Sequence, residues 1–281
     1  MQGKVCLVTG ATSGIGLATA RELARLGAVT VVVSRNAQRC AAIAARIRQE
    51  TGNPSVDFIT ADLSSQAQIR QLVEAFQIRY SRLDVLVNNV GGFFLRHMQS
   101  MDGIEMTWAL NHLSYFLLTN LLLESMRINA PGRIVNVSSD AHWGGRINFA
   151  DLQGKRRYFG WTAYSQSKLA NVLFTSELAR RLDGSRVTAN ALHPGFVATN
   201  LAKNNGGLVR LVMPLVQIGA LSPEDGARTS IYLACSPEVE GVSGKYFYKE
   251  QETPSGPSSY DLDAARRLWE ISAEMTGLPA G

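Results

Sequence analysis

The chain has 281 residues, 46% hydrophobic and 18% charged, which excludes a disordered or fibrous protein and fits one large globular domain. The net charge of +5 does not indicate a nucleic-acid partner, because the basic residues are scattered along helical faces and the one dense run, at 155–157, fits a solvated loop. The three cysteines show neither metal-ligand spacing nor an even count, so we expect no metal site and a reducing, cytoplasmic compartment.

Short β-branched apolar runs alternate with segments of helical period along most of the chain. The predicted strands are 5–9, 29–34, 56–60, 83–88, 134–138 and 187–192. Strands that are apolar on both faces and separated by helices indicate a parallel sheet covered on both sides. Right-handed crossovers then make an α/β, doubly wound Rossmann-type sandwich of about seven strands. We expect residues 1–281 to form a single domain with neither signal peptide nor transmembrane segment.

A glycine-rich turn follows the first predicted strand and opens the first predicted helix. Glycines permit a tight turn and a close backbone approach, and the helix N-terminus adds N–H groups and a positive dipole end, which suit a dinucleotide pyrophosphate. The pattern is informative because a strand precedes it and a helix follows. The predicted cofactor-binding residues of this turn are Gly10, Thr12, Ser13, Gly14, Ile15 and Gly16.

The end of the second strand favours NADP(H) over NAD(H). An NAD site typically carries an acidic residue about twenty positions after the glycines. Here that position reads Ser34-Arg35-Asn36, with no acid and one arginine. A guanidinium can grip a 2′-phosphate that a carboxylate would repel. Arg35 and Asn36 are therefore predicted cofactor contacts, and the alternative for Arg35 is an ordinary helix-entry residue.

Two further groups of residues follow the third and fourth predicted strands. Asp62 and Leu63 are placed to meet the adenine end of the cofactor, and Asn89, Val90 and Gly91 can approach it closely. Ligands bind at the carboxyl ends of the strands in such sheets, although the same residue types are common in ordinary turns.

Tyr164 and Lys168 are four positions apart in a strongly helical segment, which puts them on one helix face. A neighbouring ammonium favours the phenolate, so we expect Lys168 to pull the tyrosine pKa from about 10 towards neutrality. Such a pair alone is commonly a surface coincidence. Ser139 makes it informative, because it follows the fifth strand at the same sheet edge, where its hydroxyl can bond a substrate carbonyl.

Two polar side chains near these residues are weaker candidates. Asn111 lies in the apolar helix before the fifth strand, where it either packs or anchors a water leading to Lys168. His142 lies three residues after Ser139, near the predicted mouth of the site, and is a candidate substrate contact. The predicted substrate-binding residues are thus Ser139, His142 and Tyr164.

Taken together, these motifs resemble the short-chain dehydrogenase/reductase family from Lys4 to about Tyr246. The similar stretches are TGATSGIG at 9–16, NNVG at 88–91, WALNHLSYF around Asn111, NVSS at 136–139, YSQSK at 164–168 and HPGFVAT at 193–199. The resemblance implies a catalytic tetrad of Asn111, Ser139, Tyr164 and Lys168. In it, Tyr164 gives a proton to the carbonyl oxygen as the nicotinamide gives hydride to the carbon, and Lys168 also holds the nicotinamide ribose. The residues implied to line the carboxamide are Pro194, Gly195, Val197 and Thr199.

Within the family the chain is most similar to the retinol dehydrogenase and WW-domain-oxidoreductase branch. The similar stretches are 111–123, 138–145 and 163–182. The resemblance implies a homodimer or homotetramer formed through the helices that bear Asn111 and Tyr164. The apolar residues there suit core packing equally well, and they include Phe116, Leu117, Leu173 and Phe174.

The activity expected is that of an NADPH-dependent carbonyl reductase, or its reverse, on a bulky apolar aldehyde, ketone or alcohol of retinal-like, steroid, lipid or polyketide type. An apolar segment at about 200–222 is the predicted substrate lid. The first alternative is a non-catalytic NADP(H) sensor or interaction protein on the same fold. The second is a sugar-nucleotide epimerase or dehydratase, against which the glycine spacing and the short stretch after Pro194 both argue.

Overall fold

The computed structural model describes residues 1–128, 130–197, 205 and 220–279. They contain one eight-stranded sheet in the order β3-β2-β1-β4-β5-β6-β7-β8. The strands are β1 (Val5–Thr9), β2 (Val29–Ser34), β3 (Val56–Thr60), β4 (Val85–Asn88), β5 (Gly132–Val137), β6 (Val187–Leu192), β7 (Tyr246–Tyr248) and β8 (Gln251–Glu252). Every neighbouring pair from β3 to β7 is parallel, and β8 pairs antiparallel with β7. The predicted doubly wound parallel sheet is confirmed, with a short antiparallel strand added at one edge.

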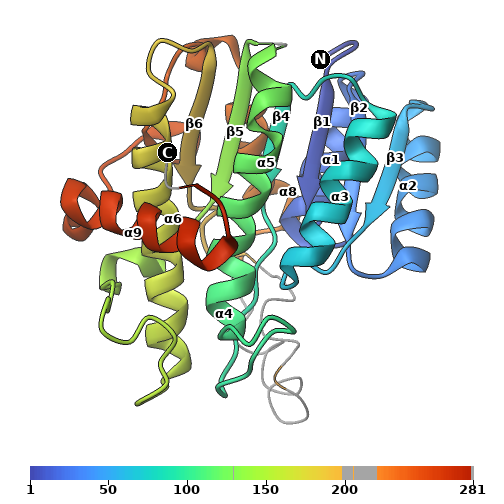
Figure 1. The fold of residues 1–281 in the computed structure, drawn as a ribbon. Helices are drawn as coiled ribbons and strands as arrows, with labels where there is room; N and C mark the ends of the chain where they lie inside the picture. The colour runs from blue at the N-terminus through green and yellow to red at the C-terminus, as the bar shows by residue number, and fades with distance from the viewer. Residues whose placement is uncertain (129, 198–204, 206–219, 280–281) are drawn as a thin grey trace.

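Helices cover both faces of this sheet (Figure 1). One face carries α1 (Gly14–Arg25), α2 (Ala37–Thr51) and α8 (Pro223–Cys235), and the other carries α3 (Gln66–Arg79), α5 (Ser114–Ile128) and α6 (Gly160–Arg181). The last helix, α9 (Leu262–Thr276), packs on α6 and α5. The remaining turns are α4 (Met106–Trp108), the π-helical η1 (Ala109–Leu113), and the 3-10 helices η2 (Asp140–Gly144), η4 (Pro237–Val239) and η5 (Pro257–Tyr260).

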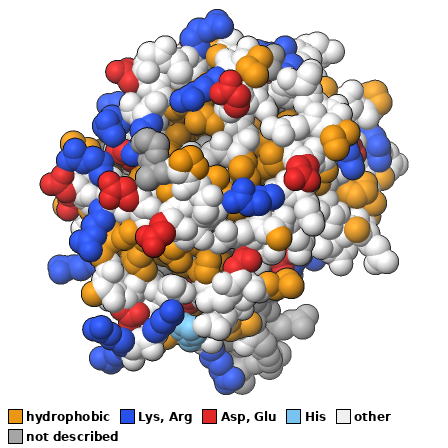
Figure 2. Space-filling model, viewed as in Figure 1, with side chains coloured by type: hydrophobic (Ala, Val, Ile, Leu, Met, Phe, Trp, Pro, Cys, Tyr) orange, Lys and Arg blue, Asp and Glu red, His pale blue; other side chains and the backbone are white. Residues whose placement is uncertain are grey.

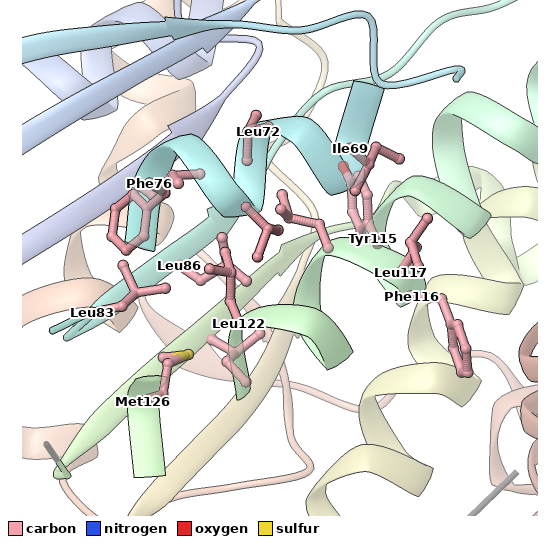
Figure 3. Close-up of a cluster of buried hydrophobic side chains, with 14 of the residues drawn as sticks. Ile69, Leu72, Phe76, Leu83, Leu86, Tyr115, Phe116, Leu117, Leu122 and Met126 are labelled. Atoms are coloured by element: carbon pink, nitrogen blue, oxygen red, sulfur yellow. The ribbon is translucent and has the colours of Figure 1, made fainter. Parts of the chain in front are cut away.

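The strands are apolar on both faces because successive side chains point to opposite helix layers. In β1, Leu7 belongs to the core beneath α3 and α5, whereas Cys6 and Val8 belong to the core beneath α1 and α2. Figure 3 shows the first of these cores, in which Phe76 of α3 and Leu122 of α5 lie close to Leu86 of β4. Both faces of the sheet are therefore buried, and the carboxyl ends of the strands remain as the edge where a site can form.

Strand bounds agree closely with the sequence pattern except near the C-terminus. Residues 5–9, 29–34, 56–60 and 187–192 are strands as predicted, while the fourth begins at Val85 and the fifth spans Gly132–Val137. The pattern does not predict β7 or β8, because strands of three and two residues are too short to show a period. The predicted lid at 200–222 lies outside the described residues except for Asn205 and residues 220–222.

Two observations bear on possible partners, one on the surface charge and one on the helices. On the face in Figure 2, Lys and Arg side chains are interspersed with Asp and Glu rather than gathered into one patch. Among the described residues, no helix has the length and apolar character needed to cross a bilayer.

Candidate active site

Three of the predicted catalytic side chains meet at the carboxyl edge of β5. Tyr164 and Lys168 project from one face of α6 and are almost fully buried, at 7% and 3% exposure. Ser139 stands two residues after β5, and its side chain is close enough to Tyr164 to lower the pKa of the tyrosine. The Lys168 ammonium lies 5.7 Å from the centre of the Tyr164 ring. The helix face predicted from the four-residue spacing therefore points at the end of the strand that carries the serine.

The ammonium of Lys168 is held by the backbone of β5. Its Nζ donates a hydrogen bond to the carbonyl of Val137 at 3.0 Å. Burial lowers the pKa of Lys168 to about 8, because a charge is costly to remove from water. Lys168 is thus fixed beside Tyr164, and it loses its proton at a lower pH than a lysine in water does.

The expected effect of Lys168 on the tyrosine is not what the structure shows. Burial raises the pKa of Tyr164 to about 12, and the hydrogen bond from Ser139 opposes this rise. The prediction of a pKa near neutrality was wrong for these surroundings, because desolvation of the phenolate outweighs the stabilisation it receives. A raised pKa keeps the Tyr164 hydroxyl protonated at neutral pH, so the hydroxyl has a proton to donate.

Asn111 acts mainly on the backbone of the loop after β4. Its Oδ1 accepts a hydrogen bond from the Gly92 N–H at 2.8 Å, and its Nδ2 donates to the Gly92 carbonyl at 3.0 Å and to Ser167 Oγ at 3.0 Å. A Cβ placed on Gly91 would lie 3.5 Å from Asn111 Oδ1 and 3.6 Å from Lys168 Nζ. Asn111, Gly91 and Lys168 therefore converge at one point of the site.

Asn171, which the sequence reasoning missed, hydrogen-bonds to the backbone of Asn111. It is fully buried on α6, and its Nδ2 donates to the Asn111 carbonyl at 2.9 Å within the π-helical turn η1. π-helical turns frequently occur at functional sites. The available signal was its position three residues after Lys168, which places it on the same helix face one turn on.

The glycine-rich turn forms a close-fitting cradle against the end of β4. A Cβ on Gly16 would lie 2.4 Å from Asn89 Nδ2 and 2.6 Å from the Gly10 carbonyl, so no side chain fits there. Gly10 has a φ of +66°, a conformation that favours glycine. Asn89 in turn donates from Nδ2 to the Thr9 carbonyl at 2.8 Å. The amide of Asn89 thus ties β4 to β1 beneath the cradle.

Helix α1 points its N-terminus into this cradle. It begins at Gly14 after an N-cap residue, Ser13, whose side chain makes no capping bond, and it carries no acidic residue in its first turn. Its first N–H groups and positive dipole end thus suit an anion. Thr12 Oγ1 donates to Ser34 Oγ at 3.1 Å, which joins the turn to the end of β2. Ile15 is buried and packs against Val197.

The residues after β2 and β3 have local structural partners as well as a place at this edge. Arg35 is exposed directly after β2, and no acidic residue lies at 34–36. Asn36 caps α2 by accepting a hydrogen bond from the Arg39 N–H at 2.9 Å. Asp62 Oδ1 accepts hydrogen bonds from the N–H and hydroxyl of Ser64, at 3.0 and 2.8 Å, and Leu63 is buried. Their roles as cofactor contacts stay predictions.

The loop after β6 completes the same edge. Gly195 adopts a φ of +82°. Val197, at 9% exposure, forms an isolated parallel bridge with Leu221. Pro194 lies at the start of this loop. Val90, in the loop just after β4, lies at the same edge, and its carbonyl accepts a hydrogen bond from the Tyr115 hydroxyl at 2.8 Å. Thr199, the last of the predicted carboxamide residues, lies outside the described residues.

His142 does not lie where the sequence reasoning placed it. It is fully buried, and its two ring nitrogens lie 2.7 Å from the Ser139 carbonyl oxygen and 2.8 Å from the Gly256 backbone nitrogen. The expectation of a substrate contact is therefore corrected. The turn η2 carries the ring inward, behind the serine, and the neighbouring Trp143 is the exposed side chain, at 52%.

Two aromatic side chains that the sequence reasoning missed lie beside Tyr164. The Phe93 ring meets the Tyr164 ring edge-on with centroids 5.7 Å apart, and the Trp161 ring lies 6.2 Å from it. Trp161 is 54% exposed and the nearby Phe159 is 65% exposed. The signal for Phe93 was its place just beyond the fourth strand, at the edge where ligands bind. These rings give the tyrosine an apolar surround that opens to solvent.

Within the part of the chain that the structure describes, no three His, Cys, Asp or Glu side chains gather in a way that could hold a metal ion.

A parallel sheet that carries, at its carboxyl edge, a glycine cradle, a half-buried serine and a buried tyrosine and lysine is the arrangement of a dinucleotide-dependent oxidoreductase. Residues 4–207 match the family model described as short chain dehydrogenase, and the chain belongs to this family. Over 99% of its length it is 45% identical to mouse "Retinol dehydrogenase 14", of which it covers 87%. It is also 43% identical to human "Polyprenol dehydrogenase", over 98% of the chain and 86% of that protein.

Solved structures agree with this assignment. The chain superposes on an uncharacterized protein from Mycobacterium paratuberculosis with a TM-score of 0.81 and 34% identity, covering 100% of this chain and 96% of that one. It superposes on the Pseudomonas aeruginosa RhlG/NADP active-site complex with a TM-score of 0.69 and 29% identity, covering 88% and 94%. The chain is thus an oxidoreductase of the retinol dehydrogenase-like branch.

Proposed function

We propose that this protein is an NADP(H)-dependent carbonyl reductase, or an alcohol dehydrogenase in the reverse direction, that acts on a bulky apolar aldehyde, ketone or alcohol. The observation that carries the proposal is the grouping of Ser139, Tyr164 and Lys168. Ser139 is half-buried and influences the pKa of the buried Tyr164, Lys168 is buried beside that ring, and aromatic rings flank it. This arrangement can hold a carbonyl oxygen and protonate it beside an apolar surface.

The chain's residues fit a nicotinamide dinucleotide. The cradle of Gly10 and Gly16 and the N-terminus of α1 would hold the pyrophosphate, because they combine close backbone approach with a positive dipole end. Arg35 would bind the 2′-phosphate of NADP(H), since no carboxylate stands at the end of β2 to repel it. The bound cofactor supplies hydride to the substrate carbon, or accepts it in the reverse direction.

The side chains then divide the remaining work. Ser139 Oγ donates a hydrogen bond to the substrate carbonyl oxygen and thereby stabilises negative charge as it develops. The Tyr164 hydroxyl, kept protonated by its raised pKa, gives its proton to that oxygen. Lys168, anchored on the Val137 carbonyl, brings a positive charge near the phenolate that this transfer leaves behind. Asn111 fixes the loop at Gly92 that bounds the site.

The aromatic side chains around Tyr164 and the names of two similar proteins support an apolar substrate. Phe93 and Trp161 flank the reacting tyrosine with apolar rings, and Phe159 extends this surface outward. Such walls bind apolar chains through area burial and leave few polar groups to satisfy. Two similar proteins are named for retinol and for polyprenol, which are both isoprenoid alcohols. A long isoprenoid aldehyde or alcohol is therefore the first substrate to test.

Turnover of NADPH with a panel of carbonyls tests the proposal. The panel runs from small ketones through steroids and polyketides to all-trans-retinal and polyprenyl aldehydes. We expect turnover to rise with apolar size and to be lowest for the small ketones. The alternative is a non-catalytic NADP(H) sensor, and it would be favoured if NADPH binds but no carbonyl in the panel is reduced.

Cofactor preference is tested at Arg35. Replacing Arg35 with Ala removes the positive charge proposed to face the 2′-phosphate, so the preference for NADPH over NADH in kcat/KM is expected to fall about tenfold or more. Arg39→Ala, one turn along α2 and also exposed, is the matched control that should leave the preference unchanged. Equal preference in Arg35→Ala and in the wild type would contradict the assignment of NADP(H) through this residue.

A further inference from the structure

His142 bridges the catalytic strand end to a distant segment near the C-terminus. Its ring is fully buried, with Nδ1 2.7 Å from the Ser139 carbonyl oxygen and Nε2 2.8 Å from the Gly256 backbone nitrogen. The backbone N–H of His142 also donates to the Ser139 carbonyl, at 3.1 Å. One residue thus supplies two donors to the carbonyl of the catalytic serine.

The hydrogen-bond partners determine which ring nitrogen carries the proton. The backbone N–H of Gly256 can only donate, so Nε2 must accept and has no proton of its own. The single proton of the neutral ring is then on Nδ1, from which it is donated to the Ser139 carbonyl. Burial lowers the pKa of His142, which keeps the ring neutral. The titratable groups that face it are Asp140, His193 and Tyr246.

The segment on the far side of the ring is itself tightly held. A Cβ on Gly256 would lie 3.1 Å from the Trp143 Cα and 3.4 Å from the His142 ring, so the backbone packs directly on the imidazole. Ser259 Oγ donates to the Gly256 carbonyl at 2.6 Å, and the Ser255 N–H donates to the Tyr260 hydroxyl at 3.1 Å. The histidine therefore rests on a cross-linked turn rather than on a loose loop.

The orientation of the peptide after Ser139 matters for the serine hydroxyl. Ser139 has an extended backbone, and its Oγ accepts a hydrogen bond from the Ala141 N–H at 3.2 Å in the first turn of η2. The same hydroxyl is close enough to Tyr164 to lower the pKa of the tyrosine. A rotation of the Ser139–Asp140 peptide would move the Ala141 N–H relative to the serine hydroxyl and so disturb the hydrogen bond that orients it.

We propose that His142 is a positioning residue, whose Nδ1–H holds the backbone of Ser139 so that the serine hydroxyl meets Tyr164 and the substrate carbonyl. The C-terminal turn at Gly256 serves as the fixed support through Nε2. This inference rests on the reductase activity proposed above and adds a residue that does not touch the substrate.

Two substitutions separate the two ring nitrogens. His142→Asn places an amide N–H near the position of Nδ1 and loses the acceptor at Nε2, whereas His142→Gln places an acceptor near Nε2 and loses the donor to Ser139. Both remove one buried hydrogen bond, so both should lower the melting temperature by similar amounts. A purely structural role would therefore affect the two variants alike.

The positioning role predicts a difference in turnover. His142→Asn should keep kcat within about threefold of the wild type, while His142→Gln should lose about tenfold or more, as expected when a reacting group is displaced by a fraction of an ångström. The KM for NADPH should stay the same in both. Equal kcat losses in the two variants, or a larger loss in His142→Asn, would overturn the proposal.

A second measurement does not depend on activity. NMR of the wild-type protein labelled with isotopic nitrogen in histidine, assigned with His142→Asn, reports which ring nitrogen of His142 is protonated. A proton on Nδ1 is expected, and a proton on Nε2 would overturn the proposal even if no carbonyl were turned over. Failure of the proposed reductase activity is therefore distinguishable from failure of this inference.

Discussion

The indole of Trp269 on α9 lies edge-on against Phe116 of α5, with ring centroids 4.9 Å apart and planes at 73°. The same indole stacks on Phe174 of α6 at 5.8 Å, and the Arg181 guanidinium lies over it at 4.3 Å. Figure 1 shows α9 crossing over α6. Phe116 and Phe174, whose apolar character suits either an oligomer interface or a core, thus pack against a helix of their own chain.

This contact predicts a large role for α9 in stability. Trp269→Ala removes a side chain that is 6% exposed, and it should lower the free energy of unfolding by about 3 to 5 kcal/mol through lost burial and the cavity left behind. Glu270→Ala, at the exposed neighbouring position, should change it by less than about 0.5 kcal/mol. Denaturant unfolding of both variants makes the comparison, and equal stabilities would show that α9 is not part of the core.

The glycine cradle predicts a sharp steric requirement at Gly16. Gly16→Ala would place its Cβ 2.4 Å from Asn89 Nδ2, so the turn must shift, at a cost of about 1 to 3 kcal/mol. NADPH affinity, measured by titration calorimetry, should fall about tenfold or more. Gly144→Ala is the control, because nothing lies within 4 Å of a Cβ there. Unchanged affinity in Gly16→Ala would mean that the cradle does not hold the cofactor.

Ser139 and its neighbour Ser138 are expected to behave differently. Ser139→Ala removes the hydroxyl proposed to bond the substrate carbonyl and should lower kcat about 10²- to 10³-fold with little change in stability. Ser138 Oγ instead donates to the Lys168 carbonyl at 2.7 Å within the core. Ser138→Ala should therefore cost about 1 kcal/mol of stability and reduce kcat less. Steady-state kinetics and thermal unfolding separate the two, and similar kcat losses would argue against a direct role for Ser139.

The buried charge of Lys168 is predicted to lower the free energy of unfolding while serving the proposed reaction. Burial lowers its pKa from 10.5 to about 8, so the charged side chain destabilises the folded state at neutral pH. Lys168→Met should abolish turnover and raise the free energy of unfolding by about 1 to 3 kcal/mol, allowing for the lost hydrogen bond to Val137.

The stability gain of Lys168→Met should depend on pH with a defined sign. Below about pH 8 the lysine is charged in both folded and unfolded states, and its full cost applies. Between about 8 and 10.5 the unfolded state binds more protons than the folded one, so the wild type gains stability as pH rises and the advantage of the variant shrinks. Melting temperatures across this range check the prediction. An advantage that stays constant with pH would contradict the lowered pKa.

Local signals predicted most of the fold and the grouping of Tyr164, Lys168 and Ser139 at one sheet edge. The strand runs, the glycine turn after β1 and the four-residue spacing of Tyr164 and Lys168 are each patterns within one segment. The pairing of His142 with Gly256 joins residues 114 positions apart, and nothing in the sequence near either one indicates it. The raised pKa of Tyr164 likewise depends on burial by several segments, so the Tyr-to-Lys spacing alone suggested the wrong direction.

The most direct test of the central claim is the effect of Tyr164→Phe on turnover and on cofactor binding. This change removes only the hydroxyl, so the buried ring and its contact with Phe93 remain. NADPH-linked reduction of the best apolar carbonyl should fall about 10²- to 10⁴-fold, while the Kd for NADPH stays as in the wild type. Turnover retained in Tyr164→Phe would contradict the assignment of Tyr164 as the proton donor.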